Sequence, residues 1–306
     1  MGHPGRWGRK GRQGACLCYP FDVGDPLGNL PAELKKYEAV LRRFLSPCVG
    51  FTLTPAAPAA LGTSRLGGGP DLPEGFSWPI HKKRPLDFLL QVDLRDLSPF
   101  QGMELLPKDG LLSFFYDLEE QPWGFDPAER DGFKVLYTPA AAPLSRHPPA
   151  HAETAFRPAQ LKFRQSYSFP SYGSRDEERL EAEAGFSEQE GEAYLDFSST
   201  LPTAGAPPDA PIHQFLGHSS NIQGDMQLEA QLVTHGLYCG NASGYEDPRR
   251  KELEAGAEDW LLLLQLDTDD SLGFMWGDCG RIYYWIRRQD LKDRRFDRAW
   301  LGLQCS

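Results

Sequence analysis

Two stretches of this sequence decide its fold: Leu86-Asp-Phe-Leu-Leu-Gln-Val-Asp93 and Trp260-Leu-Leu-Leu-Leu-Gln-Leu-Asp267. Each is a short apolar run that continues into Gln, an aliphatic residue and Asp. Continuous apolar runs of this length, bounded by turn residues, are typical of buried strands. The two stretches therefore predict two similar strands in the core of one protein.

The surroundings of the two stretches also repeat. A strand that begins with glycine follows each of them, at residues 110–116 and 280–286, and a Leu-Gly step precedes each, at Leu66 and Leu216. Three features in the same order predict an internal duplication. Because an isolated hairpin cannot bury its own apolar face, two related hairpins are expected to complete one sheet across a pseudo-twofold axis. The predicted fold class is α+β, with one internally duplicated, strand-rich domain and a few flanking helices.

Periodicity and turn residues predict the other elements. The 31 glycines and 26 prolines favour many short elements over long helices. Apolar residues three and four positions apart predict helices, which are expected at residues 30–45, 175–194, 225–237 and 247–259. Further strands are expected at residues 133–138 and 300–304.

The chain is expected to form a single domain over residues 29–306, preceded by a disordered basic tail at residues 1–28. The tail is rich in glycine and arginine and lacks apolar residues to fold against. An insertion around residues 139–211 is rich in Pro and Ala and then acidic, with a thin apolar stripe. We expect this insertion to pack loosely.

Composition excludes several classes of partner. The net charge of -11 argues against nucleic acid, whose binding requires clustered Lys and Arg. No stretch approaches the ~20 apolar residues that cross a bilayer, so no membrane association is expected. The six cysteines lack both a C-x-x-C pair and the density of a disulfide scaffold. Reduced thiols, a cytoplasmic location and no cofactor are therefore expected.

Four polar residues beside glycines are candidates for a catalytic cleft between the two repeats: Arg65, His213, Asp225 and Asp278. Together they could supply an acid, a base and a charge-stabilising group. In the alternative interpretation, Arg65 pairs with an acidic loop residue, His213 caps a strand end and Asp225 caps the following helix. No nucleophile accompanies the four at a recognised spacing.

Gln91 and Gln265 are candidates for ligand binding, because each places an amide in an otherwise apolar strand. An amide buried without partners costs about 1 to 3 kcal/mol, so each must find hydrogen bonds. In one interpretation the two amides satisfy neighbouring backbone groups and fix the register of the strands. In the other they contact a ligand.

A metal site is not expected. Asp267, Asp269 and Asp278 have the spacing of a calcium-binding loop, but Leu272 stands where such a loop needs glycine. In addition, Asp278 replaces the usual bidentate Glu. A second grouping, of Asp225 with His213, His218 and His235, lacks the spacing that aligns histidines on one face of a helix.

Several motifs together resemble the YwqG-like family, a bacterial domain of unknown function. They include Ser64-Arg-Leu-Gly-Gly68, Pro70-Asp-Leu-Pro73, His213-Gln-Phe-Leu-Gly217 and Met275-Trp-Gly-Asp-Cys-Gly280. The resemblance covers roughly residues 30–304. It implies a cytoplasmic α+β fold with internal duplication and brings no established activity, cofactor or catalytic residue. The association of the family with toxin and immunity gene neighbourhoods implies a protein-binding role.

The favoured hypothesis is a cytoplasmic binding or interaction protein, of immunity-like type, with a protein partner. Its acidic character would suit a basic partner. The alternative is a hydrolase-type enzyme or a small-ligand binder that uses a polar cleft between the two repeats.

Overall fold

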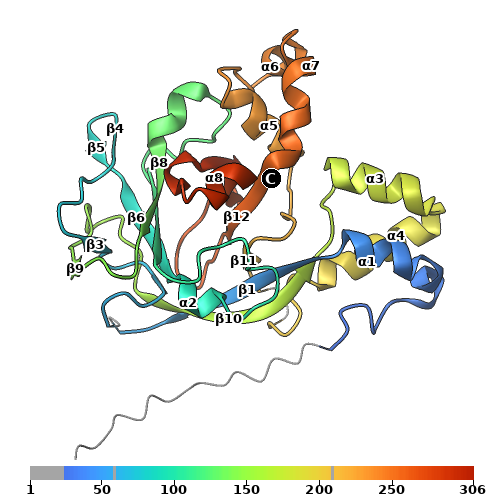
Figure 1. Ribbon diagram of the computed structural model, residues 1–306, viewed down its shortest axis with the longest axis horizontal. Coiled ribbons are helices and arrows are strands. Elements are labelled where there is room, and N and C mark those ends of the chain that lie inside the picture. Colours follow the sequence, from blue (N-terminus) through green and yellow to red (C-terminus); the bar gives the residue numbers. More distant parts are fainter. Residues whose placement is uncertain (1–23, 58–59, 208–209) are drawn as a thin grey trace, which may run out of the picture.

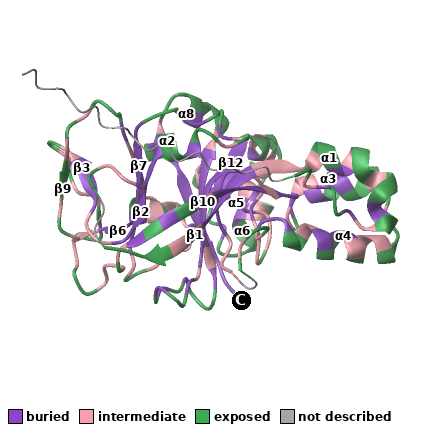
Figure 2. Ribbon diagram, turned by 90° about the horizontal axis from the view of Figure 1, so that it is seen from below, coloured by how far each residue is buried: buried purple, intermediate pink, exposed green. Residues whose placement is uncertain are grey.

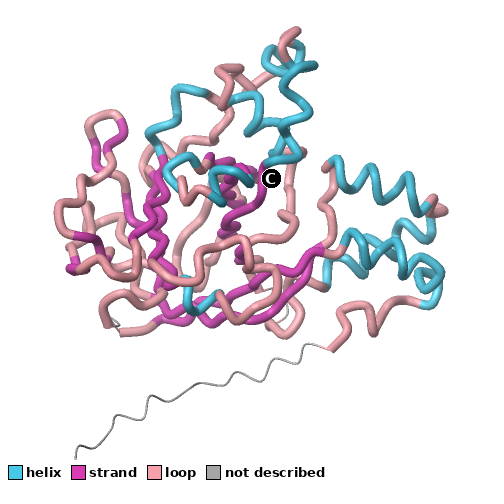
Figure 3. Tube along the Cα trace, viewed as in Figure 1, coloured by secondary structure: helices cyan, strands magenta, loops and turns pink. Residues whose placement is uncertain are grey.

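The computed structural model describes residues 24–57, 60–207 and 210–306. Its centre is a ten-stranded sheet in which all neighbouring strands are antiparallel (Figure 1, Figure 3). In spatial order the strands are β14 (Trp300–Gln304), β13 (Arg281–Arg287), β12 (Trp260–Asp267), β11 (His213–Phe215), β1 (Ser46–Pro55), β10 (Ala159–Ser168), β2 (Arg65–Leu66), β6 (Asp87–Asp93), β7 (Leu111–Tyr116) and β8 (Phe133–Thr138). The fold mixes helices with a strand-rich centre.

The sheet curls into a nearly closed barrel, and its β14 edge is covered by the chain around Trp123. The amide of Leu303 donates to the carbonyl of Trp123 at 2.9 Å, and the indole of Trp300 donates to the carbonyl of Gly124 at 2.7 Å. Gly124 has a φ of 89°, and a Cβ there would lie 1.8 Å from the carbonyl oxygen of Leu301. Only glycine permits this close approach, which covers the edge that β14 would otherwise expose.

The strands on the two sides of the central β1–β10 pair follow a similar succession. A short strand comes first on each side, with β11 beside β1 and β2 beside β10. Next come β12 and β6, which contain the two similar apolar stretches at residues 260–267 and 86–93. Each has an irregularity in its pairing with the next strand, at Leu263 and at Leu89. Both predicted strands are confirmed, and they occupy corresponding places in one sheet.

The apolar runs of β6 and β12 are buried along almost their whole length. All residues of β6 are buried, and in β12 only Leu261 is partly exposed. Aromatic rings fill the barrel interior, where the ring of Phe114 lies 5.1 Å from that of Tyr284 and 6.3 Å from that of Phe215. Because a strand that is covered on both faces buries every side chain, its apolar residues run continuously and do not alternate with polar ones.

A second, smaller hydrophobic core lies beside the barrel (Figure 1, Figure 2). It is formed by η1 (Ala32–Tyr37), α1 (Glu38–Phe44), α3 (Arg175–Ala184) and α4 (Glu188–Thr200). Leu34 and Leu41 from the first two helices pack in the same cluster as Leu180 and Tyr194 from the last two. The helix expected at residues 30–45 is therefore present, although its first half is a 3-10 helix.

The segment around residues 139–211 differs from the expected loose insertion in two places. Its strand β10 lies at the centre of the sheet and pairs with β1 at ten positions. Its helices bury part of their apolar stripe against residues 30–45, far away in the sequence. The expected single helix at 175–194 is two helices, because Gly185 ends α3 at a φ of 63° and a capping box at Ser187 begins α4.

Shorter elements connect the strands. The helices among them are α2 (Leu94–Leu97), η2 (Pro127–Gly132), α5 (Met226–Val233), α6 (Ala242–Glu246), α7 (Arg250–Leu253), η3 (Glu254–Asp259), α8 (Arg288–Lys292) and η4 (Phe296–Arg298). Two small sheets pair β3 (Asp71–Pro73) with β9 (Leu144–Arg146) and β4 (Ile80–His81) with β5 (Arg84–Pro85). No helix in the described ranges is both long and apolar enough to cross a bilayer.

Most of the predicted basic tail, up to residue 23, lies outside the described residues. Residues 24–28, which that prediction also included, contain a turn, and Leu27 is buried in the helical core. The cysteines within the described ranges, Cys48, Cys239, Cys279 and Cys305, are all free thiols.

Candidate functional site

A pocket of about 650 Å³, called here the junction pocket, lies where the two halves of the chain meet. Leu118 and Gln121 follow β7, residues 153–157 precede β10, residues 270–276 join β12 to β13, and Pro55 ends β1. Residues 24–158 thus contribute three of the lining segments and residues 159–306 contribute the fourth. The pocket exists only because the sheet brings the two halves together.

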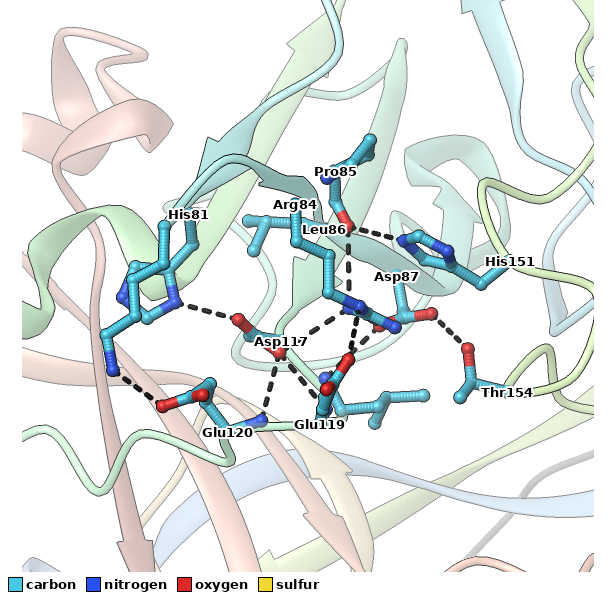
Figure 4. Close-up of polar contacts among 12 residues, drawn as sticks. His81, Arg84, Pro85, Leu86, Asp87, Asp117, Glu119, Glu120, His151 and Thr154 are labelled. Atoms are coloured by element: carbon cyan, nitrogen blue, oxygen red, sulfur yellow. Dashed lines mark hydrogen bonds and ion pairs between the residues drawn. The ribbon is translucent and has the colours of Figure 1, made fainter.

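The carboxylate of Asp87 holds one wall of the junction pocket (Figure 4). It accepts hydrogen bonds from the guanidinium of Arg84 at 2.6 Å, from the amide of Leu118 at 3.2 Å, and from the hydroxyl of Thr154. Leu118 and Thr154 both line the pocket. One buried carboxylate therefore ties together two segments that are more than thirty residues apart.

A buried imidazole–carboxylate pair shapes the turn in the same wall (Figure 4). His81 Nδ1 lies 2.8 Å from Asp117 Oδ2, and the other oxygen of Asp117 accepts from the amides of Glu119 and Glu120, both at 3.1 Å. Burial raises the pKa of Asp117, but these hydrogen bonds outweigh burial and hold that pKa below its ordinary value. His81 and Asp117 are only 6% and 1% exposed, so they position the turn and do not face a ligand.

A second imidazole–carboxylate pair holds the opposite wall. His213 Nδ1 accepts from the amide of Asp267 at 3.0 Å, so the ring proton is on Nε2, which lies 3.6 Å from Asp269. Asp269 also accepts from the amide of Ser271 at 3.0 Å. The neighbouring His213 imidazole is the largest cause that lowers the pKa of Asp269. Both walls of the junction pocket are thus anchored from behind by a buried His–Asp pair.

The floor of the junction pocket is aromatic. The ring of Phe274 lies 4.9 Å from Phe156 and 5.4 Å from Trp276, whose indole in turn contacts Tyr116 at 5.9 Å. Met275, which is 44% exposed, stands beside this floor. Phe274 and Trp276 are buried, so a side chain that enters the pocket would contact the partly exposed Phe156 and Met275 above them.

The rim of the junction pocket is charged. Glu153, Arg157 and Asp270 are exposed residues of its lining. Among the described residues the Asp270 carboxylate has no ion-pair or hydrogen-bond partner, and the only ion pair of Glu153 is at 4.0 Å, with His151. An apolar floor with accessible carboxylates suits binding of an amphipathic cation.

The four catalytic candidates do not converge. Arg65 is buried in an ion pair with Asp71 at 2.6 Å, so it pairs with an acidic residue as the alternative interpretation predicted. Asp225 caps α5 by accepting from the amides of Gln227 and Leu228, and Asp278 is exposed in the β12–β13 loop. The structure describes all four candidates, including His213. No hydrogen bond or ion pair joins any two of them.

Gln91 and Gln265 are completely buried and have matching hydrogen bonds. The amide oxygen of Gln91 accepts from the backbone of Asp71 at 2.9 Å, and its nitrogen donates to the carbonyl of Thr63 at 2.9 Å. Gln265 makes the same two bonds with Ser220 at 2.8 Å and Ile212 at 2.7 Å. Each pair of backbone partners is eight residues apart. The amides fix the strands to their preceding loops, and neither is exposed to a ligand.

The metal candidates also have partners within the protein. Asp267 pairs with Arg281 at 2.9 Å and accepts from the amide of Ile212 at 2.8 Å. Asp269 pairs with His213, and Asp278 lies apart from both. Within the described ranges no group of three or more His, Cys, Asp or Glu side chains is arranged to hold a metal ion.

Sequence reasoning missed His81, Asp87, Asp117 and Thr154. The contacts His81–Asp117 and Asp87–Thr154 span 36 and 67 residues, so no local spacing signals them. Asp87 stands inside one of the two quoted stretches, where an acidic residue in a buried strand was the available signal.

A family model described as "Domain of unknown function (DUF1963)" matches residues 64–305, which extend from the loop before β2 to the end of β14. None of the curated proteins compared with the chain matches it.

Proposed function

The chain belongs to the DUF1963 family of domains of unknown function, and on that premise we propose that it is a binding protein whose junction pocket receives a cationic group of a protein partner. The observation that carries this proposal is the pairing of accessible carboxylates on Glu153 and Asp270 with the apolar surface of Phe156 and Met275, which the buried rings of Phe274 and Trp276 support from below. A Lys or Arg side chain can lay its alkyl stem on such a surface and present its charge to the rim.

The energetics favour recognition through both parts of the pocket. An exposed ion pair contributes about 0 to 1 kcal/mol, so the rim alone would bind weakly. Burial of an alkyl stem or an aromatic neighbour adds about 0.8 kcal/mol per CH₂ group. The net charge of -11 would in addition speed the approach of a basic partner at low salt. The proposed partner is therefore basic, with an apolar residue next to its Lys or Arg.

The proposal is tested by titrating the full-length protein with an acetylated, amidated Lys-Phe-Lys peptide and following tryptophan fluorescence and heat. We expect saturable binding that weakens as salt rises and is lost for the corresponding Glu-Phe-Glu peptide. The double variant Glu153→Gln and Asp270→Asn should weaken binding about tenfold, as expected for two lost charge contacts.

The matched control is Asp196→Asn, an exposed carboxylate on α4 outside the junction pocket. This variant should bind the basic peptide as the original protein does. Equal affinity for the basic and acidic peptides, or an equal loss in the control and the double variant, would contradict the proposal.

The hydrolase alternative has less support. Three of its four candidates, Arg65, His213 and Asp225, have separate structural contacts, and both Asp-paired imidazoles near the pocket are almost completely buried. A hydrolase needs a base that reaches the substrate. We therefore retain binding, in the cytoplasm, as the proposed role, together with the narrower resemblance to the YwqG-like family.

We also propose that residues 29–306 form one domain that arose by internal duplication. The matching hydrogen bonds of Gln91 and Gln265 support this. So do Ser64 and His213, which both accept from the backbone amide of the Asp that ends each quoted stretch. When Ser64 is aligned with His213, Gly67 is aligned with Leu216, and both of these residues have a positive φ. The Leu-Gly steps in the sequence had instead aligned Leu66 with Leu216, so the two alignments differ by one position.

A further inference from the structure

A second pocket, of about 530 Å³, lies at the opposite end of β12 and β13 from the junction pocket. Its walls come from η2, the end of α5, the first residue of β12, the last residue of β13, α8 and η4. Three arginines line it: Arg130, Arg287 and Arg298. We call it the arginine pocket.

The guanidinium of Arg287 is partly buried in the arginine pocket. It lies over the ring of Trp260 at 4.9 Å and donates to Gln231 Oε1 and Thr234 Oγ1, both at 3.2 Å. Both acceptors are neutral, and its buried Nε has no hydrogen-bond partner within the described chain. Burial lowers the pKa of Arg287, since no carboxylate lies close enough to compensate fully for desolvation.

The guanidinium of Arg130 is also bound by neutral groups. It donates to the backbone carbonyls of Ala299, at 2.7 Å, and Asp297, and stacks on Trp300 at 5.6 Å. Burial lowers its pKa as well. Arg298 is exposed, and no ion pair or hydrogen bond involves its guanidinium among the described residues. Three guanidinium groups thus face one cavity without a carboxylate paired to any of them.

Two carboxylates line the arginine pocket, but neither neutralises these arginines. Asp290 is buried and pairs at 2.7 Å with Arg295, which is outside the lining. Asp297 is exposed, and it uses its backbone carbonyl, not its side chain, to accept from Arg130. The local charge is therefore positive in a chain whose net charge is -11. Distant carboxylates are screened beyond the Debye length, about 8 Å at physiological salt.

We propose that the arginine pocket binds the phosphoryl group of a small phosphorylated molecule. Guanidinium groups present planar pairs of N–H donors that match phosphate oxygens, and a dianion balances several of them at once. The rings of Trp260 and Trp300 are almost completely buried under Arg287 and Arg130, so they orient these arginines and do not stack with a ligand. A volume of about 530 Å³ exceeds that of a lone phosphate and leaves room for an organic carrier.

The test uses the full-length protein and inorganic phosphate, glycerol 3-phosphate and acetate, each at constant ionic strength. We expect both phosphate compounds to raise Tm by about 3 °C at saturating concentration, as linkage predicts for a ligand of the native state. Tighter binding of glycerol 3-phosphate would identify an organic carrier, whereas equal binding would identify the free ion. Acetate should have no effect. Stabilisation by acetate equal to that by phosphate would overturn the assignment to phosphate.

The decisive variant is Arg298→Gln, because Arg298 is exposed and its guanidinium makes no hydrogen bond or ion pair in the described structure. Loss of one charged donor should weaken phosphate binding about tenfold without changing Tm in the absence of phosphate. The matched control is Arg288→Gln, an exposed arginine ten residues earlier that lines a different pocket. The proposal is overturned if phosphate does not stabilise the original protein, or if the two variants bind it equally.

Discussion

At the scale of single residues, the two buried glutamines are the clearest determinants of the fold. Each amide joins a long β-strand to the chain on both sides of the neighbouring short strand: it donates to a carbonyl before that strand and accepts from an amide after it. The amide of Asp71 is buried and the other three backbone groups are partly buried, so water replaces a lost amide only in part. Because both side chains are completely buried and hydrogen-bonded, we expect Gln91 and Gln265 to act on the stability of the sheet.

We expect Gln91→Leu and Gln265→Leu each to destabilise the protein by about 1 to 3 kcal/mol, because each leaves one backbone donor and one acceptor unsatisfied. Urea unfolding monitored by tryptophan fluorescence measures the two costs. Gln160→Leu, in an exposed position of β10, is the control and should change stability by less than about 0.5 kcal/mol. Strongly unequal costs at 91 and 265 would argue against equivalent roles and against the proposed duplication.

The sequence indicates which buried side chains need hydrogen bonds, but it does not identify distant hydrogen-bond partners. It required that a buried glutamine find hydrogen bonds, and that requirement is met. It also offered the interpretation that Arg65 pairs with an acidic loop residue and that Asp225 caps a helix, and both contacts are present. It could not find the His81–Asp117 pair, because the two residues become neighbours only when β4 packs beside the end of β7.

At the scale of elements, α5 is coupled to α6 through one carboxyl group. Glu229 of α5 accepts from the hydroxyl of Tyr245 in α6 at 3.1 Å. Burial raises the pKa of Glu229 to about 7, and the Tyr245 hydrogen bond opposes this only in part. The folded protein therefore holds a proton on Glu229 at pH values where the unfolded chain, with an ordinary pKa of 4.5, has released it.

The sign of the resulting pH dependence follows from this difference. Between pH 4.5 and about 7 the folded state binds more protons, so the contribution of Glu229 to stability falls as pH rises. Glu229→Gln keeps an acceptor for Tyr245 and removes the titration. We expect it to raise the free energy of unfolding at pH 8 on the order of 1 to 3 kcal/mol, with little change at pH 4.5.

Chemical unfolding of the two proteins across this pH range measures the effect. Glu252→Gln, an exposed glutamate on α7, is the control and should leave the pH dependence unchanged. A Glu229→Gln variant whose stability changes with pH as steeply as that of the original protein would contradict the prediction.

Elements defined by strong local patterns were predicted well, and those defined by their neighbours were not. The strands at 86–93 and 260–267 combine long apolar runs with turn residues, so local hydrophobicity identifies them. Strand β10 alternates polar and apolar residues after a segment rich in proline, and its strand character depends on β1 pairing along its whole length. Local patterns carry no information about a partner more than one hundred residues away.

At the scale of the whole molecule, the two halves exchange their central strands. β1 from the first half lies beside β11 of the second half, and β10 from the second half lies beside β2 of the first. Each half on its own would therefore lack the strand that completes its sheet and would expose a long apolar edge. This arrangement makes the halves dependent on one another.

We expect fragments 1–149 and 150–306 each to fail to fold cooperatively when expressed alone, and to form a folded complex when expressed together. Far-ultraviolet circular dichroism, thermal unfolding and size-exclusion chromatography distinguish these states. The uncut protein is the reference for the complex. A cooperative, monomeric unfolding transition for either fragment alone would contradict the strand exchange as a requirement for folding.

Local hydrophobicity and polarity are enough to predict a strand-rich mixture of helices and strands, the two similar strands at 86–93 and 260–267, and the need to satisfy their buried amides, because each of these depends on neighbouring residues. Only the folded chain shows the exchange of β1 and β10, the second helical core, the junction pocket and the arginine pocket. Each of these is a meeting of segments that are distant in the chain, and the free energy of such contacts appears only when the sheet closes and brings them together.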